Sequence, residues 1–223
     1  MKTTRILQSI KSKKELSVEE AISLYKEKPS AIYSKEFFKK RHSKDNKWKL
    51  KIGEMLSRIY NLESLVDFGC GEGEYLQGAL KYGVRKVLGF EYLFDNVKKY
   101  LPTEILEHVK YGNVMESIDC GKFDCAMSIE VAEHILPEKS EAFVDNLVNA
   151  SKKYILLTAA PCGQGGIGHI NERPREFWIE QFIKRDFIYL ADEVSKIHVE
   201  IREEGIQIPD YFSNLLVFIK EGE

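Results

Sequence analysis

Short apolar runs alternate with segments of helical spacing through the middle of the chain. The apolar runs predict strands at 64–68, 86–91, 106–110, 123–129 and 153–159. The helical spacing predicts helices at 75–82, 93–100 and 139–150. Strands separated by helices indicate βαβ units, which build a parallel sheet. Ligands of such sheets bind at the carboxyl ends of the strands, so the polar residues that follow these runs are the first candidates for a functional site.

The segments on either side of this alternating region have different patterns. Residues 1–60 are rich in charge and carry apolar residues at helical spacing, which predicts an N-terminal helical cap segment of three helices. A glycine-rich stretch follows the last predicted strand, and a helix then begins near Pro174. Two strand-like runs, 196–202 and 214–220, come last. No break in composition marks a further domain, so we expect residues 61–223 to fold as one domain.

The first predicted strand runs directly into a turn that contains three glycines. This stretch reads Val66-Asp67-Phe68-Gly69-Cys70-Gly71-Glu72-Gly73. Glycine is needed where the backbone adopts unusual angles or approaches a ligand closely. The second strand ends at Glu91, and an acid in this place typically binds ribose hydroxyls. Together the two features predict a cofactor that contains adenosine.

Acidic residues in the same turn distinguish between two cofactors of this kind. A nicotinamide fingerprint is Gly-x-Gly-x-x-Gly, and here Glu74 occupies the place of its last glycine. The carboxylates of Asp67, Glu72 and Glu74 would repel a pyrophosphate, and they suit a ligand with an ammonium and a sulfonium. The turn therefore favours S-adenosylmethionine over NAD.

With these residues the stretch resembles the first motif of class I S-adenosylmethionine-dependent methyltransferases, and the resemblance covers roughly Ser64 to Thr158. It implies an α/β fold, a Rossmann-like three-layer sandwich. A mostly parallel seven-stranded sheet with a C-terminal antiparallel hairpin and N-terminal helices is expected. The resemblance also implies that the cofactor is bound by Asp67, Gly69, Cys70, Gly71, Gly73, Glu91, Tyr92, Asn113, Val114 and Glu130. Asn113 is expected at the adenine amine, or else as a polar turn residue only.

A second acidic stretch follows the fourth predicted strand and reads Ser128-Ile129-Glu130-Val131-Ala132-Glu133-His134. If it is helical, Glu130, Glu133 and His134 share one face. His134, or His169 from the glycine-rich stretch, is a candidate general base for a substrate hydroxyl, because imidazole titrates near neutral pH. Glu130 is the third candidate catalytic residue.

The same side chains also form a candidate metal site. Their pattern more weakly resembles Hen1-type RNA 2′-O-methyltransferases, which implies a divalent metal bound by Glu130, Glu133, His134 and His169. Such ligands suit manganese or iron, and magnesium less well. The paired histidines that this family has near a tryptophan are missing, because His169 is the only histidine in the segment just before Phe177-Trp178. In a third interpretation these residues are purely structural.

A motif that is absent after the fourth predicted strand indicates which type of nucleophile receives the methyl group. Methyltransferases that act on base amines often carry Asn/Asp-Pro-Pro-aromatic here, and Ser128-Ile129-Glu130-Val131 does not match. We expect O-methylation of a small or medium polyhydroxylated molecule such as a sugar. One alternative is a metal-dependent RNA 2′-O-methyltransferase, and another is a catalytically silent methyltransferase-like binding module.

The composition of the chain limits the classes of partner that it is expected to bind. The chain has 223 residues, is 43% hydrophobic and has a formal net charge of −2. This balance gives no overall attraction to nucleic acid or to an anionic membrane, so a small-molecule substrate is favoured and a nucleic-acid partner stays open. The chain shows neither a bilayer-spanning run nor a signal-peptide pattern, and we expect a cytoplasmic location. Free thiols are expected at Cys70, Cys120, Cys125 and Cys162. The oligomeric state is left open.

Overall fold

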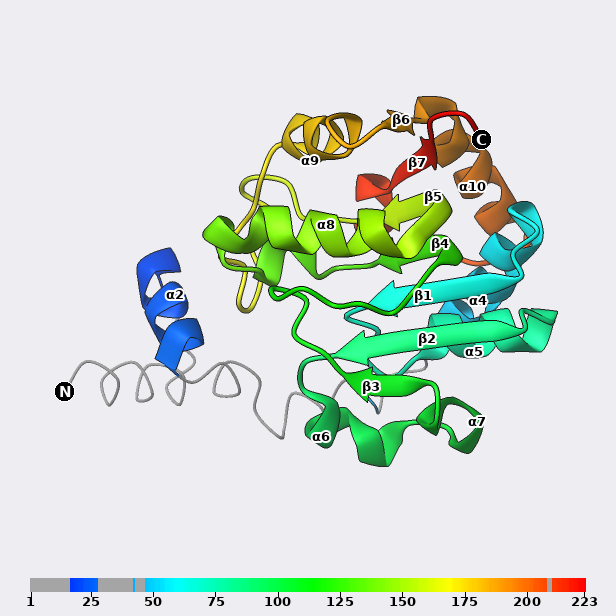
Figure 1. The fold of residues 1–223 in the computed structure, drawn as a ribbon, viewed down its shortest axis with the longest axis horizontal. Coiled ribbons are helices and arrows are strands. Elements are labelled where there is room, and N and C mark those ends of the chain that lie inside the picture. The colour runs from blue at the N-terminus through cyan, green and yellow to red at the C-terminus, as the bar shows by residue number, and fades with distance from the viewer. Residues whose placement is uncertain (1–16, 28–41, 43–46, 208–209) are drawn as a thin grey trace.

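The computed structural model describes residues 17–27, 42, 47–207 and 210–223. Its centre is a seven-stranded sheet in the order β3-β2-β1-β4-β5-β7-β6 (Figure 1). The strands are β1 (Ser64–Phe68), β2 (Lys86–Glu91), β3 (Val109–Tyr111), β4 (Phe123–Ser128), β5 (Ser151–Leu157), β6 (Phe187–Tyr189) and β7 (Leu216–Lys220).

Strands β1 to β5 pair in parallel, whereas β7 is antiparallel to both of its neighbours, β5 and β6. Every residue of β1 is buried, since helices cover both faces of a parallel sheet. From β1 the chain builds the sheet outward through β2 and β3, and it then returns to add β4 and β5 on the other side. Ligands of doubly wound sheets bind in the crevice at such a reversal, which here falls at the carboxyl ends of β1 and β4.

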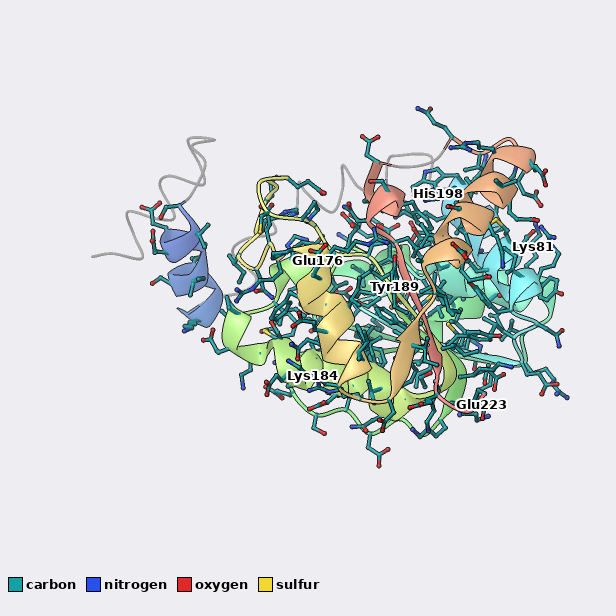
Figure 2. All side chains as sticks on the ribbon, turned by 90° about the horizontal axis from the view of Figure 1, so that it is seen from above. Lys81, Glu176, Lys184, Tyr189, His198 and Glu223 are labelled. Carbon is teal, nitrogen blue, oxygen red and sulfur yellow. The ribbon has the colours of Figure 1, made fainter. Side chains whose placement is uncertain are left out.

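Helices form the two outer layers. On one face the sheet carries α4 (Lys47–Ile59), α5 (Glu74–Tyr82) and α10 (Ala191–Glu203). On the other face lie α8 (Ser140–Ala150) and α9 (Arg175–Ile183). Two short helices, α6 (Phe94–Val97) and α7 (Thr103–Leu106), lie between β2 and β3. Figure 2 looks onto α9, near whose ends Glu176 and Lys184 lie, and onto α10 with His198.

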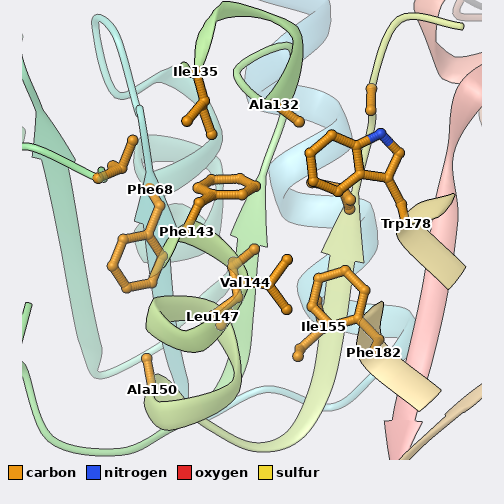
Figure 3. Close-up of a cluster of buried hydrophobic side chains, with 14 of the residues drawn as sticks. Phe68, Ala132, Ile135, Phe143, Val144, Leu147, Ala150, Ile155, Trp178 and Phe182 are labelled. Atoms are coloured by element: carbon orange, nitrogen blue, oxygen red, sulfur yellow. The ribbon is translucent and has the colours of Figure 1, made fainter. Parts of the chain in front are cut away.

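The layer formed by α8 and α9 packs on the sheet through large side chains (Figure 3). Trp178 of α9 is only 1% exposed and meets Phe143 of α8 edge to face, with ring centroids 6.2 Å apart. Phe182, one turn further along α9, is fully buried beside Phe218 of β7. This packing explains the aromatic spacing in α9 and makes Trp178 a core residue.

The opposite layer has a close helix crossing that the strand and helix pattern did not reveal. A Cβ at Gly78 of α5 would lie 2.0 Å from the carbonyl oxygen of Leu50 in α4. A Cβ at Gly53 of α4 would lie 2.2 Å from the carbonyl oxygen of Tyr75. Only glycine allows the two backbones to approach this closely. The crossing fixes α5, which begins directly after the glycine turn, against α4.

The predicted N-terminal helices are described in part. Two of them are α4 and α2 (Val18–Glu27), and the remainder of the predicted three-helix segment lies outside the described residues. Leu24 of α2 is fully buried in the same apolar cluster as Phe68, and Lys26 pairs with Glu138 at 2.7 Å. Figure 1 shows α2 on the side toward which the strands point. The domain boundary at residue 60 stays a prediction.

The predicted fold class is confirmed, including the antiparallel strands at the C-terminal end, but one strand was assigned wrongly. Residues 196–202 belong to helix α10, and the sixth strand is Phe187–Tyr189. The alternation of Ile197, Val199 and Ile201 suggested a strand. In the structure Val199 is exposed, and the buried positions Val194, Ile197 and Ile201 have helical spacing.

Other boundaries moved by a few residues. The third strand was expected at 106–110 and lies at Val109–Tyr111, because α7 occupies Thr103–Leu106. The helix expected at 93–100 is α6 followed by a 3₁₀ turn, Lys98–Tyr100. Among the described residues, no helix combines the length and the apolar character needed to cross a membrane.

Candidate functional site

The glycine turn after β1 has the backbone that its sequence predicts. Gly69, Gly71 and Gly73 all have positive φ angles, of 87°, 57° and 73°. The N–H groups of Gly69 and Cys70 donate to the carbonyl oxygen of Phe90, at 2.7 and 3.1 Å. A Cβ at Gly69 would lie 2.4 Å from a methyl carbon of Val131. The turn is therefore bound to β2 on one side and in contact with the segment after β4 on the other.

Glu91 closes the same turn from the end of β2. Its Oε2 accepts the N–H of Gly71 at 3.0 Å, and its Oε1 accepts the N–H of Leu93 at 2.8 Å. A carboxylate has about four acceptor positions, so each oxygen can accept a further hydroxyl. Both oxygens therefore keep acceptor capacity, and the ribose-binding role of Glu91 stays a prediction.

The acidic residues of the turn differ in their surroundings. Asp67 is 2% exposed at the end of β1, and Glu72 is also buried. Glu72 Oε2 contacts His42 Nδ1 at 3.0 Å, while its buried Oε1 has no hydrogen-bond partner within the part of the chain that the structure describes. Glu74 instead pairs with Lys49 of α4 at 3.4 Å. A buried carboxylate oxygen in need of a donor fits a cationic ligand and does not fit a pyrophosphate.

Cys70 and Tyr92 were also predicted to contact the cofactor. Cys70 is buried against β2, where a Cβ at Gly89 would lie 2.6 Å from its sulfur. Burial raises the pKa of the Cys70 thiol well above its usual range, which makes it an unreactive packing residue. Tyr92 follows Glu91, and its ring centroid lies 6.0 Å from that of Tyr111 at the end of β3.

The segment after β3 is fixed mainly by its own hydrogen bonds. The side chain of Asn113 accepts the N–H of Met115 at 3.1 Å and donates to Glu116 at 2.9 Å, which supports the alternative role as a turn residue. Val114 is buried, and its carbonyl oxygen accepts a bond of 2.9 Å from Asn146 of α8. The sequence analysis did not single out Asn146. A single amide on the apolar face of helix 139–150 could have identified it as a buried hydrogen-bonding residue.

The stretch after β4 is a turn followed by a 3₁₀ helix, Ala132–His134, so the α-helical face considered for it does not form. Glu130 has a positive φ of 59°. Its N–H donates to Thr158 Oγ1 at 2.8 Å, and that hydroxyl donates back to Glu130 Oε1 at 2.9 Å. Thr158, which the sequence did not single out, thus fixes Glu130 to the end of β5.

Three of the four predicted metal-binding residues come together. Glu133, His134 and His169 each place one potential ligand atom within 4.8 Å of the others. The two imidazole rings meet edge to face, with centroids 5.0 Å apart. Glu130 is not part of this group, although its carboxylate faces that of Glu133 closely enough to affect its pKa. We call Glu133, His134 and His169 the acceptor-side cluster.

Glu133 is the most perturbed acid of the cluster. It is fully buried, and neither of its carboxylate oxygens forms a hydrogen bond within the described residues. Burial, and then the charge of Glu130, raise the pKa of Glu133 to about 8. A buried acid of this kind is neutralised by a proton or by a cation, and either form fits a functional site.

Asn171 joins the two halves of the cluster. The backbone N–H groups of Ile170 and Asn171 donate to the carbonyl oxygen of Glu133, at 2.9 and 3.0 Å. The buried amide of Asn171 also donates to Ala132 O at 3.2 Å and to Ser140 Oγ at 3.0 Å. These bonds hold the loop after β5 against the turn after β4. Sequence reasoning missed this role, because it depends on contacts between distant segments.

Hydrogen bonds at Nδ1 orient both histidines. His134 Nδ1 lies 3.0 Å from the carbonyl oxygen of Gly168, which can only accept, so this nitrogen carries the proton. His169 Nδ1 lies 2.8 Å from Glu172 Oε1. Burial opposes ionisation of Glu172, but its hydrogen bonds, first of all from His169, lower the pKa of this carboxyl. Histidines that bind metals in proteins have the same second partner, a carbonyl or a carboxylate.

The fold is that of a Rossmann-like methyltransferase domain of class I. Residues 33–160, more than half of the chain, match a family described as a methyltransferase domain. The chain belongs to this family. A search of curated proteins finds no match.

Solved structures agree with the fold. The methyltransferase domain of bacterial CtHen1-C is 18% identical with a TM-score of 0.53, covering 78% of this chain and 98% of that one. Magnesium protoporphyrin IX methyltransferase from Synechocystis PCC 6803, solved with S-adenosylhomocysteine, is 11% identical with a TM-score of 0.59 and coverages of 86% and 97%. Human N-acetylserotonin methyltransferase, solved with S-adenosylmethionine, is 12% identical with a TM-score of 0.61 and coverages of 99% and 66%.

Proposed function

We propose that this protein is an O-methyltransferase that uses S-adenosylmethionine and acts on a small or medium polyhydroxylated molecule. The observation that carries the proposal is the acceptor-side cluster, which supplies two imidazoles and an acid beside the glycine turn. Contact between Gly69 and Val131 joins these two parts at the crevice of the sheet. Family membership supports methyl transfer, and the named neighbour N-acetylserotonin methyltransferase supports a small acceptor.

S-adenosylmethionine, when bound, supplies an electrophilic methyl group on a sulfonium. Glu91 accepts the ribose hydroxyls, and the acids of the glycine turn favour the positive charge of the ligand. His169 keeps its proton on Nδ1, so its Nε2 is the atom that accepts the proton of the acceptor hydroxyl. The rest of the rate enhancement comes from alignment, because methyl transfer is an in-line displacement.

The preference for a polyhydroxylated acceptor follows from the polarity of the cluster. The side chains of Glu130, Glu133, His134 and His169 are all polar and lie close together, and Glu133 has no hydrogen bond at either carboxylate oxygen within the described residues. An apolar acceptor would leave these two oxygens unsatisfied, which costs about 1–3 kcal/mol for each group. A sugar or another polyol satisfies them.

The test combines binding and transfer. S-adenosylhomocysteine is titrated by calorimetry, and radiolabelled S-adenosylmethionine is then offered with a panel of sugars and polyols. We expect binding without added metal, transfer to at least one polyol, and loss of transfer in His169→Ala with binding retained. His198→Ala is the matched control, because His198 lies on α10, where its Nε2 donates to Phe212 O at 2.9 Å. Absence of binding would instead support the silent binding module.

A metal-dependent RNA 2′-O-methyltransferase is the second candidate, and the geometry of the acceptor-side cluster favours it. The donor set fits a divalent ion, because Glu133 has two buried oxygens without a hydrogen bond in the described part of the chain and His169 is oriented by a carboxylate. Glu133, His134 and His169 would hold the ion, which would polarise a ribose hydroxyl. Calorimetric titration with Mn²⁺ tests the site. Binding that disappears in Glu133→Ala and persists in the exposed control Glu107→Ala, together with labelling of short RNA, would support this function.

A further inference from the structure

Glu172 joins the glycine-rich loop after β5 to the imidazole of His169. Its Oε1 accepts His169 Nδ1 at 2.8 Å and the N–H of Gly165 at 2.7 Å, and its Oε2 accepts the N–H of Gly163 at 2.7 Å. We propose that Glu172 is a positioning residue that sets the tautomer of His169 and folds the loop 163–168 over the acceptor side. The inference rests on the proposed role of His169 in accepting a proton.

The first step concerns the proton on the imidazole. An ionised carboxylate can only accept hydrogen bonds. His169 therefore donates from Nδ1, and in the neutral ring its Nε2 has the lone pair. Without this partner nothing in the described contacts of His169 would select that tautomer. Glu172 thus determines which nitrogen can receive the proton of a substrate hydroxyl.

The second step concerns the loop. Gly163 and Gly165 have positive φ angles of 85° and 70°, and a Cβ at either position would meet no atom within 4 Å. Side-chain packing therefore does not hold this part of the loop. Its bonds to Glu172 hold it, together with a bond of 2.8 Å between Gln164 and Asn214. Hydrogen bonds to a charged group are about twice as strong as neutral ones, so a single carboxylate can hold both glycines of the loop.

The third step connects the loop to the ring itself. A Cβ at Gly166 would lie 2.3 Å from Nε2 of His169 and 2.6 Å from each flanking carbon. These distances place Gly166 over the face of the ring and not at its edge, so Gly166 itself does not block the lone pair of Nε2 in the ring plane. The loop covers the imidazole while Glu172 orients it. Loop order and the proton-accepting state of His169 therefore depend on the same side chain.

Glu172→Ala tests this coupling without knowledge of the acceptor. Alanine has no side-chain acceptor, so all three bonds are lost, whereas the oxygen of a glutamine would still accept His169 Nδ1 and keep the tautomer. In the wild type, nitrogen NMR of the imidazole is expected to show the His169 proton on Nδ1. In Glu172→Ala we expect a mixture of the two tautomers and about tenfold faster hydrogen exchange at Gly163 and Gly165. Glu176→Ala, at an exposed acid on α9, should change neither.

Two results would overturn the proposal. One is a wild-type spectrum with the His169 proton on Nε2, which needs no variant and is therefore independent of any folding defect. The other is a Glu172→Ala protein that binds S-adenosylhomocysteine normally, shows faster exchange in the loop and keeps the Nδ1 proton, since that would make Glu172 a structural residue only. Failure of the proposed function is a separate result, namely methyl transfer that survives His169→Ala.

Discussion

The imidazole rings of His134 and His169 meet with their planes at 82° and their centroids 5.0 Å apart. The two residues follow different strands, β4 and β5, and the sheet brings the carboxyl ends of these strands together. The final approach depends on the loop after β5, whose backbone donates twice to the carbonyl oxygen of Glu133. The pairing of the histidines is therefore a property of the loop junction as well as of the sheet.

Asn171→Ala is expected to weaken this junction. The change removes the buried donor to Ala132 O and Ser140 Oγ, and it leaves those acceptors without their partner. We expect a loss of about 1–3 kcal/mol in the free energy of unfolding, measured with urea. Asn149→Ala, at an exposed position of α8, is the control and should stay within about 0.5 kcal/mol. Equal stability of both variants would mean that the amide does not hold the loop.

Glu91→Ala is expected to weaken cofactor binding. The carboxylate binds the glycine turn through the N–H of Gly71, and in the proposed function it accepts the ribose hydroxyls. Hydrogen bonds to a charged group contribute about 1.5–3 kcal/mol, so the Kd for S-adenosylhomocysteine should rise about 10- to 100-fold. Calorimetry measures the change, and Glu91→Gln should lose less. Glu107→Ala, an exposed acid outside the turn, should bind normally. An unchanged Kd in Glu91→Ala would remove Glu91 from the ribose site.

The sequence predicted the parts of the fold that local patterns determine. The buried run Leu65–Phe68, the glycine turn and Glu91 are close neighbours in sequence or belong to one βαβ unit, so their spacing was sufficient. The strand at Phe187–Tyr189 was missed because it has only three residues and lies at an edge of the sheet. Residues 196–202 alternate like a strand, and only tertiary packing of Ile197 and Ile201 shows that they are helical.

The sequence predicted which residues form the candidate site, but it did not predict the residues that hold them in place. The segment with Glu130, Glu133 and His134 stood out through its acids and its place after a strand. Thr158 and Asn171 did not stand out, since each acts through bonds to a segment about 30–40 residues away, and spacing within the sequence carries no signal of such bonds. The sequence did not reveal Gly53 and Gly78 either, because their importance depends on the crossing of two helices.

Gly78→Ala tests that crossing. The added methyl would lie 2.0 Å from Leu50 O and 2.8 Å from the nitrogen of Glu54, so α4 must shift away from α5. Alanine gains up to about 1 kcal/mol in helix propensity, and overpacking costs about 1–3 kcal/mol or more at backbone contacts. We expect a net loss in the urea unfolding free energy. Lys81→Ala on the same helix removes only a surface ion pair and should change it little. A more stable Gly78→Ala protein would show that the helices can separate freely.

Glu133→Gln should change how stability depends on pH in the metal-free protein. The folded pKa of Glu133 is raised to about 8, by burial and then by Glu130, whereas the unfolded value is about 4.3. Between these values the unfolded chain releases this proton and the folded chain keeps it, so the contribution of Glu133 to stability falls as pH rises and levels off above about 8. Glutamine has no proton to release. The melting temperature of Glu133→Gln relative to wild type should therefore increase from pH 5 to pH 8, measured in the presence of a chelator. Expressed as a free energy of unfolding, this change is at most about 5 kcal/mol. A difference that is constant over this range would show that Glu133 is ionised in the folded protein.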